Sequence, residues 1–308
     1  MRRFGLMLVT LFGISVIIFV LLRLTPGNIA DILFDAGGFV DPADKARIEA
    51  DLGLDKSIPV QYAAWIGGLL QGDLGMSYQT EKPALEEIAP RIPITARLAV
   101  LALSFAVLFG VPLGVISAVK QNTKLDYLLR IISLSGLSMP AFWHGLLILM
   151  GFVAYFGTIP IYSDEPVGFW NTLLMYSVPA AAVGFRSSAL MMRLTRSSML
   201  EVLRQDYIRT ARAKGLPERT VLYRHALRNA LIPIVTLVGL QFGALLAGAI
   251  VTETIFSWPG VGRLTITAIS NRDYALVQGC ILAVGLTYIL VNLATDILYA
   301  VLNPRIRA

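Results

Sequence analysis

Residues 98–119, LAVLALSFAVLFGVPLGVISAV, run for 22 positions without a charged side chain. A helix of about 20 apolar residues is long enough to cross the hydrocarbon core of a bilayer. The rest of the 308-residue chain agrees, because 56% of its residues are hydrophobic, 15% are charged and the mean hydropathy is +0.69. Soluble domains carry about 25% charged residues. The sequence therefore predicts an all-α polytopic membrane protein.

Five further segments are apolar over a similar length, so the sequence predicts six transmembrane helices. An even number of spans places both termini on the same side of the membrane. The first apolar run follows MRRF and exceeds the h-region of a signal peptide, and no A-x-A cleavage site follows it, so we interpret it as an uncleaved span. The predicted spans are residues 4–22, 98–119, a stretch within 131–163, 167–194, 229–252 and 274–295.

Positive charge is concentrated between the fourth and fifth predicted spans. Residues 193–228 hold nine Arg or Lys side chains against three acidic ones, a surplus of six that equals the formal charge of the whole chain. Residues 25–93 hold five basic and eleven acidic side chains. Because basic loops stay in the cytoplasm, both termini are predicted to be cytoplasmic. Clustering between spans favours an acidic protein partner and argues against nucleic-acid binding.

The predicted spans divide the chain into four parts. Residues 1–24 form the first transmembrane helix, and residues 25–93 form an extracytoplasmic loop with short helices. Residues 94–303 form a five-helix core that includes a cytoplasmic loop at 195–230. Residues 304–308 form a cytoplasmic tail.

Two short helices are predicted in the extracytoplasmic loop. DPADKARIEADLGL at 41–54 is typical of a helix that Asp41 caps and Gly53 ends. IPVQYAAWIGGLL at 58–70 is amphipathic enough to lie on the membrane surface or to cap the pore entrance. The alternative for the second helix is a packing lid without a ligand role.

The cytoplasmic stretch 206–233 reads DYIRTARAKGLPERTVLYRHALRNALIP. Asp206 is a good N-cap residue, and Gly215 followed by Pro217 is a typical helix end, so a helix of about eight residues is predicted. A helix this short is marginal on its own in water. It must therefore pack against something, and a second helix begins at Pro217 and continues into the fifth span.

Two features favour docking of the short helix into a groove of another protein. Several of its residues are small and allow close approach, and basic side chains surround them. The alternative is a positive-inside loop that only contacts lipid headgroups. The residues assigned to the docking helix are Asp206, Tyr207, Arg209, Thr210, Ala211, Arg212, Ala213, Lys214 and Gly215, with the small surface at Thr210, Ala211, Ala213 and Gly215.

This stretch is similar to the cytoplasmic loop of permease subunits of ATP-binding-cassette importers, in the branch that carries dipeptides, oligopeptides and nickel. The loop motif of that family places an alanine at Ala211 and a glycine at Gly215, whereas the wider family has glutamate where this chain has Arg209. The similarity covers nearly the whole chain. Its other motifs are RLTPGNIA, LGLDKSIPVQYAAWIGGLLQGDLGMSY, LTRSSMLEVLRQDY, GLQFGALLAGAIVTETIFSWPGVGRL, RDYALVQG and DILYAVLNPRIRA.

The resemblance implies a fold like that of a type I importer permease, in the bacterial inner membrane. In such a system two homologous permeases, here expected as a heterodimer, form the pore. Two ATPase subunits bind their cytoplasmic loops, and an extracytoplasmic binding protein delivers the substrate. No G-x-x-x-x-G-K-[ST] sequence occurs in the chain, so ATP and Mg are expected in the partner subunits.

The resemblance implies di- or oligopeptides as cargo, with nickel or another small solute such as a glycoside or an opine as the alternative. Two other classes are disfavoured by the residues themselves. A secondary transporter is expected to contain carboxylates at the membrane midplane, where this chain has none. An intramembrane enzyme is expected to contain a motif such as H-E-x-x-H or G-x-S-x-G, and neither occurs.

Polar and helix-breaking residues inside the spans are candidates for a translocation pathway, because they are costly in a membrane. Arg186 either faces such a pathway, or packs toward the cytoplasmic side or pairs inside the bundle. Glycines in the spans, such as Gly110, Gly114 and Gly184, suit close helix packing. The pathway candidates are Met139, Pro140, Arg186 and Asn292. The sequence assigns no catalytic, cofactor-binding or metal-binding residue, and its one cysteine excludes a multi-cysteine metal site.

Overall fold

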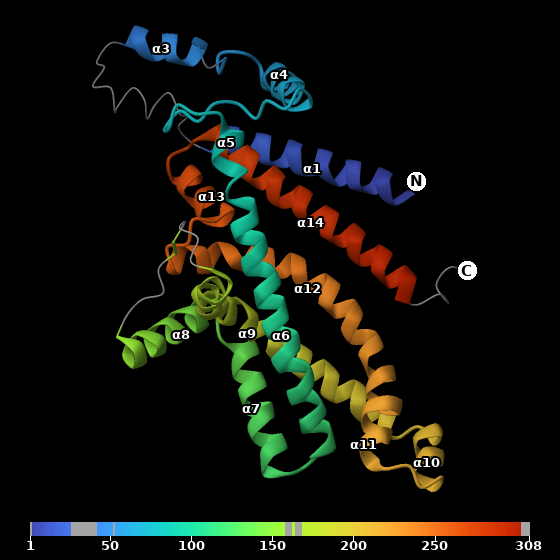
Figure 1. The fold of residues 1–308 in the computed structure, drawn as a ribbon. Coiled ribbons are helices and arrows are strands. Elements are labelled where there is room, and N and C mark those ends of the chain that lie inside the picture. The colour runs from blue at the N-terminus through green and yellow to red at the C-terminus, as the bar shows by residue number, and fades with distance from the viewer. Residues whose placement is uncertain (1, 26–41, 52, 158–161, 164–167, 303–308) are drawn as a thin grey trace. The chain divides into compact units, whose positions relative to one another are not determined.

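The computed structural model describes residues 2–25, 42–51, 53–157, 162–163 and 168–302 (Figure 1). Within these ranges the regular structure is helical, apart from an isolated β-bridge between Met76 and Pro83. The contacts divide the chain into two compact units. Unit 1 comprises Met1–Thr95 and Pro259–Ile289, and unit 2 comprises Ala96–Trp258 and Leu290–Ala308. The four-part division expected from the sequence stays a prediction.

Unit 1 is built around two helices that run side by side, α1 and the beginning of α14 (Figure 1). Its apolar core includes Ile18 of α1, Ile88 of α5, and Val277 and Cys280 of α14. Its helices are α1 (Arg2–Leu24), α3 (Pro42–Asp51), α4 (Ile58–Leu70), α5 (Ala84–Ile88), α13 (Val261–Ser270) and the beginning of α14 (Tyr274–Leu302).

The two short helices predicted before α5 are present as α3 and α4. Gly53, with φ +64°, lies at the predicted end of α3, whereas the predicted cap Asp41 lies outside the described residues. Helix α4 packs on α1 through polar contacts. Tyr62 shares a hydrogen bond of 2.8 Å with Ser15, and Arg23 Nε donates to Gln61 Oε1 at 2.7 Å. These contacts fix α4 against α1, and the choice between a membrane-surface helix and a packing lid stays a prediction.

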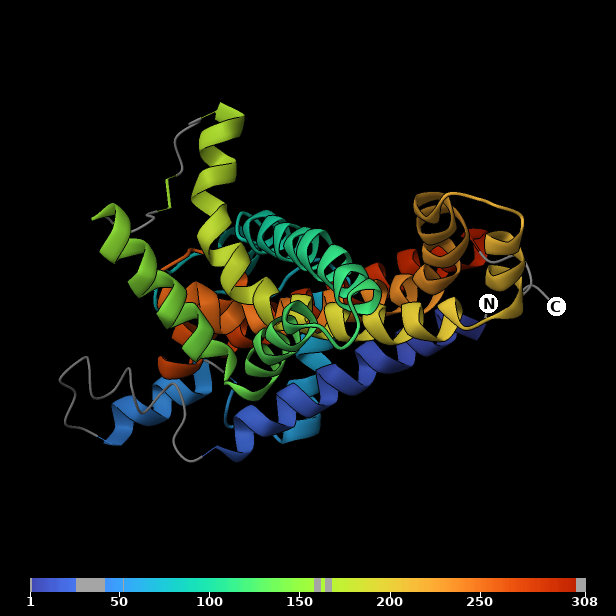
Figure 2. The same ribbon diagram turned by 90° about the horizontal axis from the view of Figure 1, so that it is seen from below.

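Unit 2 contains the cytoplasmic stretch and the helices that flank it. Figure 2 shows α9 running along this unit toward α10. The helices are most of α6 (Ile92–Val119), α7 (Lys124–Ser138), α8 (Ala141–Phe156), α9 (Gly168–Leu203), α10 (Asp206–Ala213), α11 (Glu218–Thr220), the π-helix η1 (Val221–Leu227), α12 (Arg228–Ile255) and the end of α14.

Close packing of α6 against α9 requires glycine at the contact. A Cβ atom on Gly114 would lie 2.6 Å from the carbonyl oxygen of Met192, and one on Gly110 would lie 2.6 Å from that of Ser188. On the facing helix, a Cβ on Gly184 would lie 2.6 Å from the carbonyl oxygen of Ala102. Such distances exclude any side chain, as in the small-xxx-small contacts of membrane helices.

Four helical segments among the described residues are long and apolar enough to cross a membrane: Gly5–Leu24, Ala84–Val119, Glu218–Leu246 and Tyr274–Thr295. The pair α7 and α8 meets the same test only when taken together. Helix α9, which carries three arginines, is not among these segments. The count of six spans therefore stays a prediction.

The third predicted span, within residues 131–163, stays a prediction, because the structure does not form it as one continuous helix. It is divided between α7 and α8, which are bent by 117°. The break lies at Met139 and Pro140, which have extended backbones with ψ of 147° and 143°. The proline ring disfavours a helical conformation in the residue before it, so the helix ends there.

Candidate functional site

Helix α10 begins one residue earlier than the sequence indicates. Gln205 is the N-cap residue, with an extended backbone and no side-chain cap hydrogen bond, and Asp206 is the first helical residue. The prediction of Asp206 as N-cap is therefore wrong. Its carboxylate instead pairs with Arg209 at 3.3 Å on the exposed surface, and a negative charge in the first turn still complements the helix dipole.

The predicted end of α10 at Gly215 is confirmed. The amide of Gly215 donates to the carbonyl of Arg212 at 2.9 Å, and the amide of Leu216 donates to that of Ala211 at 3.4 Å. This is the double hydrogen bond of a Schellman motif, which needs a left-handed residue after the helix. Gly215 provides it with φ +74°.

The inner face of α10 is apolar and belongs to a cluster at the end of unit 2. Ile208 is fully buried and Ala211 is 7% exposed, and both pack with Val115 of α6, Met199 of α9 and Val221 of η1. Ala211 is therefore not on the free surface, so the predicted small-residue contact face is wrong at this residue. The exposed residues are Asp206, Tyr207, Arg209, Thr210, Arg212, Ala213, Lys214 and Gly215.

Two polar links join α10 to the helix that follows it. Arg212 donates to both carboxylate oxygens of Glu218, at 2.7 and 3.1 Å, across the turn at Gly215. These hydrogen bonds raise the pKa of Arg212, which keeps its charge at physiological pH. Asn229 Nδ2 donates to the hydroxyl of Tyr207 at 2.8 Å. Because α11, η1 and α12 follow one another directly, α10 is firmly attached to the base of α12.

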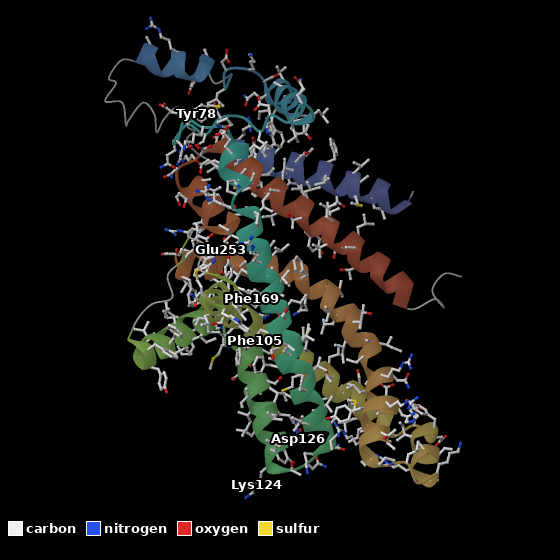
Figure 3. All side chains as sticks on the ribbon, in the orientation of Figure 1. Tyr78, Phe105, Lys124, Asp126, Phe169 and Glu253 are labelled. Carbon is white, nitrogen blue, oxygen red and sulfur yellow. The ribbon has the colours of Figure 1, made fainter. Side chains whose placement is uncertain are left out.

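A buried ion pair, which the sequence did not reveal, joins α7 and α9 at the end of unit 2 that carries α10. Asp126 is fully buried, and Arg196 donates to both of its carboxylate oxygens at 2.9 Å. Ser117 of α6 and the amide of Asn122 also donate to this carboxylate. Figure 3 places Asp126 close to the turn between α6 and α7. The ion pair therefore fixes three helices beside α10.

Of the four pathway candidates, Arg186 lines a cavity. This cavity has a volume of about 390 Å³, and we call it the Arg186 cavity. Gln241 Nε2 donates to Ser187 Oγ at 2.9 Å beside it. Its described lining does not include Met139, Pro140 or Asn292, whose roles stay predictions. The lining comes from α7 (Leu137), α9 (Ala182, Val183, Arg186, Ser187, Leu190) and α12 (Gln241, Ala244, Leu245, Thr252).

Two family models together match nearly the whole chain. Residues 110–308 match the model described as "Binding-protein-dependent transport system inner membrane component". Residues 1–99 match the model of the N-terminal part of the same membrane component.

Several curated relatives are similar over their full length. The di/tripeptide transport system permease protein DppB of Pseudomonas aeruginosa is 44% identical, over 99% of this chain and 97% of the relative. The dipeptide transport system permease protein DppB of Escherichia coli is 43% identical, over 100% and 98%. The glutathione transport system permease protein GsiC of Pectobacterium atrosepticum is 43% identical, over 97% and 95%.

Solved structures of low sequence identity share the fold. One is a chain of the MetNI methionine ABC transporter in an inward-facing conformation, with TM-score 0.57 and 15% identity, covering 74% of this chain and all of that one. Another belongs to an amino acid ABC transporter, with TM-score 0.52 and 16% identity, covering 71% and 94%. The chain thus belongs to the inner-membrane components of binding-protein-dependent transport systems and is a multi-pass protein of the inner membrane.

Proposed function

We propose that this chain is a pore-forming transmembrane subunit of an ATP-driven importer of di- and oligopeptides. The observation that carries the proposal is its full-length similarity to permeases named for dipeptides, tripeptides and glutathione. Glutathione is itself a small peptide with free carboxylates, so these relatives share one chemical class of cargo. Nickel and other small solutes remain the alternative for the cargo.

The chain works with ATPase subunits and a substrate-binding protein. It contains no phosphate-binding loop, so the partner ATPases bind ATP and Mg. We place one ATPase on the exposed face of α10 and the binding protein on the opposite side of the membrane. A second homologous permease completes the pore, and both termini lie in the cytoplasm with α10.

Attachment of α10 to its neighbours supports a role in coupling. Ile208 anchors its inner face in the cluster shared with α6, α9 and η1, and the Arg212–Glu218 pair fixes its end to α11. A displacement of α10 by a closing ATPase dimer therefore moves the bases of α9 and α12 with it. Both helices line the Arg186 cavity, so this movement changes access to that cavity.

The Arg186 cavity supports a place for the solute within the membrane. A guanidinium group binds a carboxylate through two parallel hydrogen bonds, and every unmodified peptide carries a carboxylate at its C-terminus. The Gln241–Ser187 pair adds neutral polar groups. Met139, Pro140 and Asn292 remain candidates elsewhere along the pathway, the first two at the break between α7 and α8.

Reconstitution tests the proposed function. The complete complex, purified with its partner permease, ATPases and binding protein, is expected to accumulate a labelled dipeptide in proteoliposomes only when ATP is present. Labelled nickel and a labelled glycoside are tested as alternative substrates in the same assay. Uptake of nickel or glycoside with no uptake of any peptide would reject peptides as the cargo.

Cross-linking tests where the ATPase binds. Cysteine is introduced at Ala213 on the exposed face of α10 or, as a matched control, at Ala211 on its buried face. We expect a thiol-specific cross-linker to join residue 213 to an ATPase subunit and to leave residue 211 unmodified, because Ala211 faces its own chain. Native Cys280 is fully buried and gives little background. Equal cross-linking at both positions would contradict the assignment of the docking face.

A further inference from the structure

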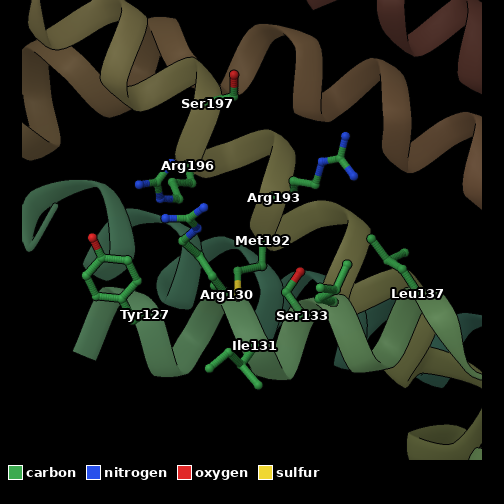
Figure 4. A pocket seen from close by; sticks show the side chains of 10 residues that line it. Tyr127, Arg130, Ile131, Ser133, Leu137, Met192, Arg193, Arg196 and Ser197 are labelled. Atoms are coloured by element: carbon green, nitrogen blue, oxygen red, sulfur yellow. The ribbon is translucent and has the colours of Figure 1, made fainter. Parts of the chain in front are cut away.

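A second cavity lies between α7 and α9 (Figure 4). Its residues on α9 fall within 192–197, whereas those of the Arg186 cavity fall within 182–190, so it lies further along α9 toward α10. Its volume is about 500 Å³, and we call it the Arg193 cavity. Leu137 lines both cavities, so the two adjoin at this residue. The lining comes from α7 (Tyr127, Arg130, Ile131, Ser133, Leu134, Leu137) and α9 (Met192, Arg193, Arg196, Ser197).

The Arg193 cavity carries two positive charges that Asp126 does not neutralise. Arg196 is held by Asp126, and its guanidinium is committed to that ion pair. Arg130 lies near the ring of Tyr127, at 5.6 Å, and among the described residues neither Arg130 nor Arg193 has an acidic partner. A cleft with charges of one sign between apolar walls focuses the electrostatic potential and concentrates ions of the opposite sign. The cavity is therefore suited to an anionic group.

The spacing of the arginines on α9 matches the size of a small peptide. Arg186 and Arg193 are seven residues apart, which places them on one face of the helix and separates them by about 10 Å along its axis. An extended tripeptide is about 10 Å long, and an extended dipeptide, at about 7 Å, approaches this spacing with its side chains. A peptide that leaves the Arg186 cavity can thus bring its carboxylate to Arg193 while its other end still lies in the Arg186 cavity.

We propose that Arg193 and Arg130 form a second binding station for the carboxylates of a passing peptide, on the route from the Arg186 cavity to the cytoplasm. This inference rests on the proposed function as a peptide importer. The station recognises negative charge, so it favours peptides with acidic side chains over those with basic ones. It therefore adds a preference for negatively charged peptides to the selectivity of the binding protein.

The test compares uptake of Ala-Glu and Ala-Lys by the reconstituted complex, each at a saturating concentration of its loaded binding protein. Arg193→Gln and Arg130→Gln are each expected to lower the ratio of Ala-Glu to Ala-Lys uptake by about fivefold, the effect of losing one partly exposed charge pair. Arg193→Lys, which keeps the charge, is expected to restore most of the ratio. Lys124→Gln is the matched control, because Lys124 is an exposed cation on α7 outside the cavity lining.

Two outcomes would overturn the second station. The first is an unchanged uptake ratio in both glutamine variants. The second is a loss that is equal for both peptides and varies with the anionic lipid content of the vesicles, which would make the cavity a lipid-headgroup site. In either case wild-type uptake of dipeptide remains, and the proposed function stands. Failure of the wild-type complex to take up any peptide would reject the proposed function itself. Arg130→Gln serves as an independent variant if Arg193→Gln does not assemble.

Discussion

Gly215→Val is expected to reduce ATP-dependent peptide uptake roughly tenfold or more while the complex still hydrolyses ATP. Gly215 has φ +74°, and a β-branched residue is strained by about 1–3 kcal/mol in this left-handed region. Relief of the strain breaks the hydrogen bonds that end α10 and shifts Arg212 away from Glu218. The ATPase then moves a helix that is no longer firmly joined to α12. Uptake and hydrolysis are measured together on the same vesicles.

Gly215→Asn separates the two reasons for a glycine at this position. A Cβ atom on Gly215 meets nothing within 4 Å in this chain, and asparagine tolerates the left-handed conformation. If the backbone conformation alone matters, Gly215→Asn keeps most of the uptake. If the ATPase packs closely against Gly215, the asparagine variant loses uptake as well. Normal uptake by Gly215→Val would contradict the coupling role of α10.

The helices were largely predictable because a long apolar run in a membrane must satisfy its backbone hydrogen bonds internally, which an α-helix does. The run at 98–119 lies within α6 and that at 229–252 within α12. Apolar length alone did not give the angle between α7 and α8, which is set where Pro140 ends α7 and the chain turns. The 10-residue helix α13 was not predicted, because it lies in a connection between two spans where apolar length gives no signal.

At the candidate site, the sequence predicted where α10 ends, but it did not predict which of its residues are buried against other helices. Gly215 and Pro217 identified the end of α10 correctly, because turn chemistry is local. The burial of Ala211 depends on α6 and α9, whose approach no local pattern describes. Likewise the sequence identified Arg196 only as one of the nine basic residues at 193–228 and gave no sign of its ion pair. Its partner Asp126 is 70 residues away, and only the packing of α7 on α9 brings the two together.

The ion pair that this packing creates should dominate the stability of the end of unit 2. Asp126→Ala leaves the guanidinium of Arg196, which is 20% exposed, without its carboxylate, and it removes the acceptor of Ser117 and of the amide of Asn122. Breaking a buried pair by removing one partner costs about 3 kcal/mol or more. We therefore expect a markedly lower melting temperature for the purified complex in detergent, measured by size-exclusion chromatography after heating.

Two further variants show whether burial of the pair is the cause. Glu218→Gln removes the carboxylate of the Arg212–Glu218 pair, whose side chains are 43% and 55% exposed, and is expected to cost less than about 1 kcal/mol. Asp126→Ala combined with Arg196→Met removes both buried partners and is expected to recover much of the loss, because no uncompensated charge remains. A single variant Asp126→Ala as stable as Glu218→Gln would show that Arg196 reaches water once its partner is gone. The helices beside α10 would then be held by their apolar contacts, their glycine packing and the hydrogen bond from Ser133 Oγ to the carbonyl of Ala189.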